Sequence, residues 1–331
     1  MPNPAIYLIH DDQHRTVRSI RDLFGDASLY YMDYIADDRI NDVLSAGAGS
    51  SEELRAVLEK LLISGRFPET TFDADCSIFK TKTRDGHILV GRNFDFTHAL
   101  NSLLIRKERV GSFASLGLAD LTFAGIEPGQ LSDGVTDISA AMMFPFTTMD
   151  GMNEKGLFIG VLALSGEPTH QNTGQKKITT GVAIRATLDK ADTVQEATEL
   201  FASYDMQSVV SDLDFHFFVA DRSGDSKVIE YFEGRMYLID TDHVTNFYLS
   251  PSAADRDSAG KNRYDVLDAL IRYRGEDLER QDVMSALRLV SQPAGNSGRS
   301  NTLWSAVYDL TAGELDLTIG RRYDDIRHFK L

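Results

Sequence analysis

The spacing of apolar residues along this chain changes from helical to strand-like near residue 75. Before that point, a capping-type start at Ser50 or Ser51, ahead of Glu53, opens a helix. The residues on its apolar face are Leu54, Val57, Leu58 and Leu61. Helical spacing also covers residues 16–24. Glycine and proline soon after residue 64 end the second helix. Residues 1–75 are therefore predicted to be mostly helical.

Beyond residue 75 the pattern predicts strands joined by tight turns, with helices between blocks of strands. A hairpin joins residues 76–83 to residues 87–96, and one long helix covers residues 181–204. Further strands are predicted at residues 214–220, 227–231, 235–239, 302–309 and 315–319, and further helices at residues 262–273 and 280–291. Because strands and helices come in blocks rather than alternating singly, the sequence favours an α+β fold with antiparallel pairing.

Composition restricts the class of protein. Hydrophobic residues make up 42% of the chain and charged residues 25%, which is typical of globular proteins. The net charge of -16 argues against a nucleic-acid partner, because phosphate backbones are bound by a surplus of lysine and arginine. No apolar run approaches the length of about 18 residues that a membrane span needs, and the first residues lack a signal-peptide pattern.

Cys76 is the only cysteine among the 331 residues, so an internal disulfide is excluded. The eight histidines show no metal-ligand spacing, and no glycine-rich dinucleotide or phosphate-binding motif is present. We therefore expect a cytoplasmic protein that works without a metal or cofactor.

A thiol, a guanidinium and a carboxylate lie on the predicted hairpin, as Cys76, Arg92 and Asp95. A free thiol with a pKa of ~8.5 is a poor nucleophile at neutral pH unless a base or a positive charge assists it. If the chain is cut before Cys76, the new α-amine has a pKa of ~7.7 to 8.0 and can act as that base. Arg92 would then hold the thiolate and Asp95 would orient the amine. A buried structural cysteine beside a surface ion pair is the alternative at this point.

Three motifs follow one another in the chain: Cys76-Ser77-Ile78, Gly91-Arg92-Asn93-Phe94-Asp95 and Asp150-Gly151-Met152-Asn153-Glu154-Lys155-Gly156-Leu157. Together they resemble the choloylglycine hydrolase and penicillin V acylase family of linear-amide hydrolases, and the resemblance extends from Cys76 nearly to the C-terminus. It implies a four-layer αββα sandwich of the N-terminal-nucleophile type and a Cys76 nucleophile that is exposed by removal of the preceding residues. It also implies that Arg92 lies beside the sulfur, Asp95 lies beside the α-amine, and Arg263 is the later active-site arginine.

The chain departs from that family at two positions. Ala163 stands where bile-salt hydrolases carry an oxyanion asparagine, so backbone N–H groups would take more of that role. Asp212 stands where the family has a second asparagine, before the strand that contains His216, which the pattern treats as a core residue. Asn246, Ser300 and Asn301 are further candidate oxyanion donors, although such residues more often close turns.

Residues 1–75 resemble the helical prosegments of acid ceramidase, N-acylethanolamine amidase and isopenicillin N acyltransferase proenzymes, which cut themselves. We therefore expect a prosegment at residues 1–75 and a catalytic domain at residues 76–331. The expected activity is autocatalytic release of the prosegment, followed by hydrolysis of a small-molecule N-acyl amide through a thioester. Transfer of the acyl group to an amine and a non-catalytic binding role stay as alternatives, and a homo-oligomer is left open.

Overall fold

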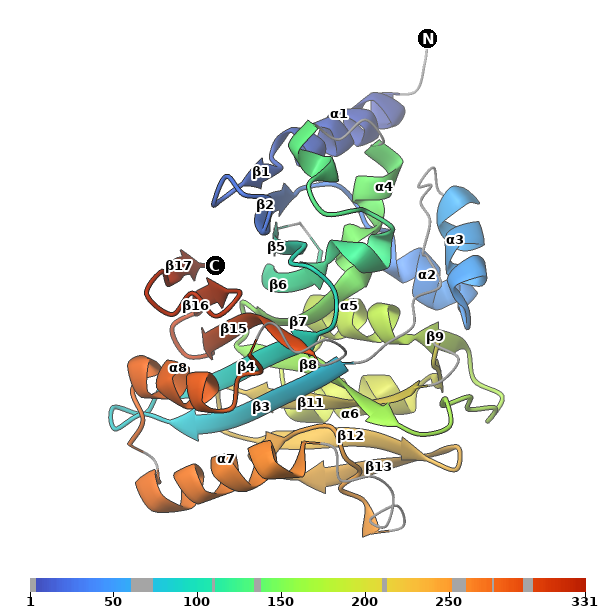
Figure 1. Cartoon of the computed structure of the whole chain (residues 1–331). Coiled ribbons are helices and arrows are strands. Elements are labelled where there is room, and N and C mark those ends of the chain that lie inside the picture. The colour runs from blue at the N-terminus through green and yellow to red at the C-terminus, as the bar shows by residue number, and fades with distance from the viewer. Residues whose placement is uncertain are drawn as a thin grey trace.

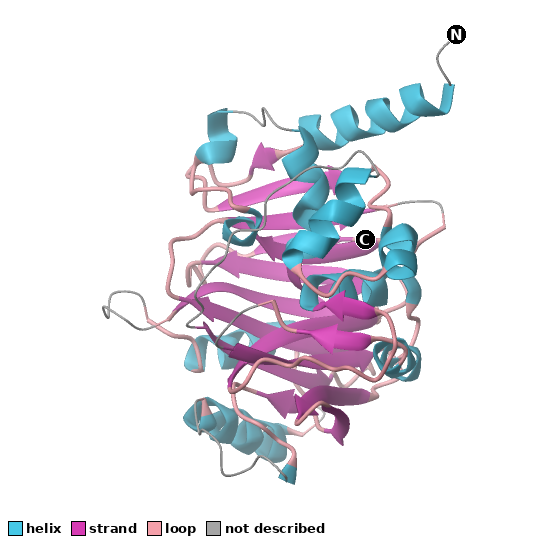
Figure 2. Ribbon diagram, turned by 90° about the vertical axis from the view of Figure 1, so that its right-hand side faces the viewer, coloured by secondary structure: helices cyan, strands magenta, loops and turns pink. Residues whose placement is uncertain are grey.

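The computed structural model describes residues 4–60, 74–108, 111–133, 138–209, 213–251, 260–275, 277–293 and 300–331. Two β-sheets lie face to face, and helices pack on the outer face of each one (Figures 1 and 2). The α+β, four-layer αββα architecture predicted from the sequence is confirmed. Within the described residues, no helix is both long enough and apolar enough to cross a membrane.

The larger sheet contains nine strands in the described part of the chain, in the order β1-β2-β5-β6-β7-β8-β11-β12-β13. Their bounds are β1 Arg21–Asp22, β2 Leu29–Tyr34, β5 Ser102–Lys107, β6 Ser115–Asp120, β7 Thr148–Asn153, β8 Leu157–Ser165, β11 Leu213–Asp221, β12 Ser226–Phe232 and β13 Arg235–Asp240. Its neighbouring strands are antiparallel except for β2 and β5, which run parallel.

The second sheet has six described strands in the order β14-β3-β4-β15-β16-β17, all antiparallel to their neighbours. They are β14 His243–Val244, β3 Ala74–Lys82, β4 Ile88–Phe96, β15 Asn301–Asp309, β16 Glu314–Ile319 and β17 Arg327–Lys330. A separate parallel pair joins β9 (Lys177–Thr179) to β10 (Asp205–Gln207). The hairpin predicted around Cys76 is confirmed as β3 and β4.

The helices of the described residues are α1 Pro4–Arg18, α2 Ile40–Ala46, α3 Ser51–Lys60, α4 Ile138–Met143, α5 Thr180–Lys190, α6 Val194–Ala202, α7 Lys261–Arg274 and α8 Arg280–Leu289, with short 3-10 turns at Leu121–Ala124, Gln130–Asp133 and Phe144–Thr147. One apolar core joins α5 and α6 to the nine-stranded sheet, and a second lies between the two sheets. A third core joins α7 and α8 to the six-stranded sheet. The predicted helices at residues 262–273 and 280–291 are thereby confirmed.

The long helix predicted over residues 181–204 is wrong in one respect, because it is two helices. The backbone of Thr193 is extended, with φ -133° and ψ 163°, and its hydroxyl accepts the N–H of Glu196 as the N-cap of α6. Apolar spacing continues across this break because both helices pack on the same sheet. Periodicity alone therefore could not reveal the new start.

The segment before Cys76 is also less helical than predicted. Helix α1 ends at Arg18, and residues 21–34 contain the strands β1 and β2 instead of the end of a helix. Strand β2 lies inside the nine-stranded sheet, where Tyr30, Met32 and Tyr34 are buried in the core (Figure 1). Strand β2 is rich in tyrosine, which favours strands, but it lies in a segment interpreted as mostly helical. Its pairing with β5 is a long-range contact that local spacing does not encode.

Candidate active site

Cys76 is the third residue of β3 and is buried, with 1% of its surface exposed. It lies opposite Phe94 of β4, and Asp75 lies opposite Asp95. Its backbone N–H donates to Oδ1 of Asn246 at 2.5 Å. The peptide bond between Asp75 and Cys76, where cleavage is predicted, is therefore held within a paired strand.

Arg92 of β4 is fully buried between the sheets. Its Nε lies 3.3 Å from Oδ2 of Asp150, and its Nη2 donates to the carbonyl of Val161 at 2.8 Å. Among the described residues, its Nη1 has no hydrogen-bonding oxygen or nitrogen partner. Although burial opposes it, attraction to the Cys76 sulfur and to Asp150 raises the pKa of Arg92. Arg92 is thus a permanently charged group beside the thiol.

Burial raises the pKa of the Cys76 thiol, and the nearby Asp95 carboxylate raises it further. Arg92, the backbone N–H of Asp95 and Arg263 all act in the opposite direction. Burial is the largest of these effects, so the uncut chain holds the sulfur mainly as the neutral thiol near pH 7. A base is therefore needed for the sulfur to act as a nucleophile.

Asp95 is fully buried, and burial raises its pKa to about 6, against the opposing effects of Arg263 and the hydroxyl of Thr302. Thr302 donates to Oδ1 at 2.6 Å. The other oxygen, Oδ2, lies 3.7 Å from Nη1 of Arg263 and accepts no hydrogen bond from any described residue. Asp95 therefore keeps one free acceptor oxygen inside the site.

Arg263, on the first turn of α7, joins the residues on both sides of the predicted cleavage point. Its Nη1 donates to the Cys76 carbonyl at 2.5 Å and to Oγ of Ser77 at 3.0 Å. Its Nη2 donates to Oδ1 of Asp75 at 2.6 Å and to Oδ1 of Asn246 at 3.1 Å. The structure thus brings Cys76, Arg92, Asp95 and Arg263 together, as the sequence predicted, although their roles stay predictions.

Of the two positions that depart from the family pattern, the structure describes the surroundings of Ala163. Nδ2 of Asn246 donates to the carbonyl of Ala163 at 2.9 Å, and Ala163 has no side-chain donor of its own. His216 is buried, with Nε2 2.9 Å from the carbonyl of Thr245 and Nδ1 3.4 Å from Glu230, so it packs as a partnered core residue. Asp212 lies outside the described residues.

Asp150 is the residue of this site that the sequence reasoning missed, because the motif around it was interpreted as a structural turn. Its carboxylate accepts hydrogen bonds from Nε1 of Trp304 at 3.1 Å and from the Tyr308 hydroxyl at 2.5 Å, in addition to Arg92. Its position as the first residue of the third motif was the available signal. Asn153 in the same motif does form the turn, accepting N–H bonds from Lys155 and Leu157.

Among the described residues, no group of three or more histidine, cysteine, aspartate or glutamate side chains is arranged to hold a metal ion. The described functional groups at the site are a thiol, two guanidinium groups, carboxylates and amides. These groups suit nucleophilic attack on a carbonyl carbon with charge stabilisation.

Comparison with known families gives a match to the model of linear amide C-N hydrolases, choloylglycine hydrolase family, over residues 76–246, which is more than half of the chain. The chain belongs to the choloylglycine hydrolase family. It is accordingly a hydrolase that acts on linear amide C–N bonds. A search of curated protein sequences gave no match.

Solved structures similar to this choloylglycine hydrolase family member include a mutant of conjugated bile acid hydrolase from Clostridium perfringens, with 15% identity and a TM-score of 0.57, covering 77% of this chain and 92% of that chain. A second variant of that bile acid hydrolase has 16% identity, a TM-score of 0.58 and the same coverage. Penicillin V acylase from Agrobacterium tumefaciens has 18% identity and a TM-score of 0.54, covering 77% of this chain and 86% of that chain. These likenesses confirm the fold.

Proposed function

We propose that this family member is a cysteine amidase that activates itself by cutting the bond between Asp75 and Cys76. The Cys76 sulfur attacks the Asp75 carbonyl carbon, the thiol proton passes to the Cys76 nitrogen as the C–N bond breaks, and the acyl group moves to sulfur as a thioester. Water then hydrolyses this thioester, leaving Asp75 with a new carboxylate and Cys76 with a free α-amine. The observation that carries the proposal is that Arg92 and Asp95 of the paired strand both lie close enough to Cys76 to act on its thiol, and that Oδ2 of Asp95 accepts no hydrogen bond from a described residue.

In turnover, the α-amine takes the thiol proton while the sulfur attacks the substrate carbonyl. The same amine returns the proton to the departing nitrogen, and water hydrolyses the acyl thioester. Arg92 stabilises the thiolate by charge. Asp95 accepts a hydrogen bond from the protonated amine through Oδ2, which the uncut chain leaves without a described partner. Its ionisation is favoured once the ammonium group is present.

The oxyanion is held by neutral donors in this proposal. Asn246 reaches the site from the segment after β14 and offers Nδ2, which in the uncut chain donates to the Ala163 carbonyl. Backbone N–H groups supply the rest, since Ala163 lacks an amide side chain. Donors fixed by the sheet and by Arg263 need little reorganisation during the reaction.

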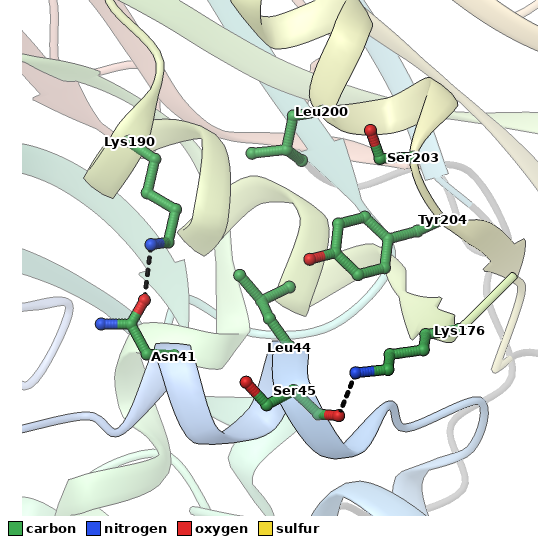
Figure 3. A pocket seen from close by; sticks show the side chains of 8 residues that line it. All are labelled: Asn41, Leu44, Ser45, Lys176, Lys190, Leu200, Ser203 and Tyr204. Carbon is green, nitrogen blue, oxygen red and sulfur yellow. Dashed lines mark hydrogen bonds between the residues drawn. The ribbon is translucent and has the colours of Figure 1, made fainter.

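We further propose that residues 4–60 stay bound after cleavage and are not released as the sequence alone suggested. Strand β2 pairs with β5 along six consecutive residue pairs and buries Tyr30, Met32 and Tyr34. Lys190 donates to Asn41 and Lys176 donates to the Ser45 carbonyl, so both lysines join the catalytic domain to α2 (Figure 3). The hollow beside them, of about 500 Å³, lies at this junction and is lined by none of the predicted site residues.

A buried charge cluster supports the same proposal. Asp38, from the N-terminal segment, lies 2.9 Å from Nζ of Lys107 and 3.9 Å from Nε of Arg185. Lys107 and Arg185 also bind Asp189, each at 2.7 Å, and all four side chains are buried. Loss of Asp38 would leave two buried cations facing one carboxylate, which is strongly unfavourable.

The substrate class we propose is a small-molecule N-acyl amide, acted on in the cytoplasm, where a single thiol stays reduced. The test compares wild type with Cys76→Ala on a panel of N-acyl amides of graded acyl length, with and without an added amine acceptor. Hydrolysis by the cleaved wild type and none by the variant is expected. New amide products in the presence of the acceptor would instead favour acyl transfer, and hydrolysis by Cys76→Ala would refute the proposal.

A further inference from the structure

Two side chains donate hydrogen bonds to the carboxylate of Asp75, one to each oxygen. Nη2 of Arg263 donates to Oδ1 at 2.6 Å, and the hydroxyl of Ser300 donates to Oδ2 at 2.6 Å. The two donors are buried, with 4% and 2% of their surfaces exposed, whereas the Asp75 side chain is 33% exposed. An arginine with a hydroxyl opposite it is thus a preformed carboxylate site at the edge of the catalytic centre.

The position of this carboxylate in the reaction follows from the chain itself. In self-cleavage the Asp75 carbonyl is the acyl carbonyl, so the Asp75 side chain occupies the acyl side of the site. The same sulfur attacks the substrate in turnover. A substrate's acyl group must therefore enter the space that Asp75 leaves.

We propose that Arg263 and Ser300 bind a carboxylate on the acyl part of the substrate, two carbons from the carbonyl that is attacked. The succinyl group has this geometry, as does an N-substituted aspartyl group. This inference rests on the proposed self-cleavage and names the substrate class of that same site.

The charge balance after cleavage favours an anion at this position. Once Asp75 departs, the remaining hydrogen-bond acceptors of Arg263 are neutral, namely the Cys76 carbonyl, Ser77 and Asn246. Its other carboxylate neighbour, Asp95, is 3.7 Å away and faces the new ammonium of Cys76 in the proposed mechanism. Arg263 therefore carries a buried charge without a close counter-ion until an acyl carboxylate binds.

The guanidinium is also held in place before the substrate arrives. Nη1 is fixed by Cys76 and Ser77, which leaves Nη2 directed toward the position of Asp75. A fixed donor loses little conformational entropy on binding, so its contribution to affinity is large for a single contact.

The test uses a matched pair of chloromethyl ketones on the cleaved wild-type protein. The reagents are 5-chloro-4-oxopentanoate, which carries the carboxylate two carbons from its ketone, and its neutral methyl ester. Alkylation is followed by intact mass, and peptide mapping locates the label at the single cysteine. Each rate is divided by the rate of the same reagent with glutathione, which removes differences in intrinsic reactivity.

We expect the acid to alkylate Cys76 about 10- to 100-fold faster than the ester after this correction, as hydrogen bonds to a charged group imply. Ser300→Ala should reduce this ratio by about tenfold. Ser285→Ala, on the exposed face of α8, should leave the ratio at the wild-type value. If Ser300→Ala cuts itself slowly, the same mass spectrum distinguishes the labelled fragment that begins at Cys76.

Equal rates for the acid and the ester, or a faster ester, would overturn the carboxylate site while leaving the amidase proposal standing. A ratio unchanged by Ser300→Ala would overturn the assignment of Ser300. An uncut protein, or a Cys76 no more reactive than glutathione toward either reagent, would remove the proposed function and this inference together.

Discussion

Arg92 and Asp150 form an ion pair between the two sheets, with Nε 3.3 Å from Oδ2 and both side chains fully buried. Asp150 is in turn fixed by Trp304 and Tyr308 from β15. The charge beside the Cys76 thiol is therefore positioned by a strand of the opposite sheet. This relationship makes Asp150 a positioning residue for the candidate nucleophile.

Replacing Asp150 by asparagine should destabilise the protein by about 3 to 5 kcal/mol, because Arg92 would become a buried charge without a counter-ion. Urea unfolding measures this loss, and Asp265→Asn on the exposed face of α7 is the matched control, expected to change stability by less than about 0.5 kcal/mol. In the folded fraction, the pH profile of Cys76 alkylation should also shift as Arg92 moves. A stable variant with an unshifted profile would contradict this role.

The pKa of Asp95 predicts a specific pH dependence in the uncut chain. Burial raises that pKa from 3.8 to about 6, so the native state binds the proton more tightly than the unfolded state does. The resulting stabilisation is complete below about pH 4 and is lost as pH rises through about 6. Between pH 4 and pH 7 we expect Cys76→Ala to lose about 2 kcal/mol of stability relative to Cys76→Ala/Asp95→Asn. A difference independent of pH would show that Asp95 is ionised throughout.

The proposed retention of the N-terminal segment can be tested by size-exclusion chromatography of the cleaved protein. We expect the two fragments to elute together, because β2 and Asp38 are built into the body of the catalytic domain. Asp38→Asn should weaken their association, whereas Asp42→Asn, an exposed carboxylate of the same segment, should not. Separation of the wild-type fragments without denaturant would contradict the proposal.

The turn at Gly156 offers a test of the strand geometry that carries Asp150. Gly156 has φ +76°, and a Cβ there would lie 2.4 Å from the Leu310 carbonyl oxygen. Gly234 has a similar φ of +73° with open space around it. Gly234→Ala should therefore cost about 1 to 2 kcal/mol from backbone conformation alone, and Gly156→Ala should cost more, by about 1 to 3 kcal/mol. Equal losses in thermal unfolding would contradict the close packing at this turn.

The sequence predicted the fold class and most of the hairpin strands because their apolar alternation is local. The strand pair that contains Cys76 and Arg92 was predicted from spacing alone, and the structure confirms its pairing. Strand β2 was missed because it is stabilised by a distant partner, β5. The break at Thr193 was missed because the apolar face continues across it.

The residues of the candidate site also divide into those that sequence patterns identified and those that only long-range contacts reveal. Cys76, Arg92 and Asp95 were identified because they lie on one hairpin and match a family motif, and Arg263 was identified through the resemblance. Asp150 was missed because its role depends on a contact across the sheets. The hydrogen bond from Ser300 to Asp75 joins residues far apart in the chain, so no local pattern could indicate it.

The proposed mechanism requires that Cys76 becomes the first residue of its own chain. Intact-mass spectrometry of the purified full-length protein tests this most directly, beside Cys76→Ala incubated in the same way. We predict two polypeptides for the wild type, one ending at Asp75 and one beginning at Cys76, and a single uncut chain for the variant. A wild-type protein that hydrolyses N-acyl amides while the bond between Asp75 and Cys76 stays whole would contradict the account.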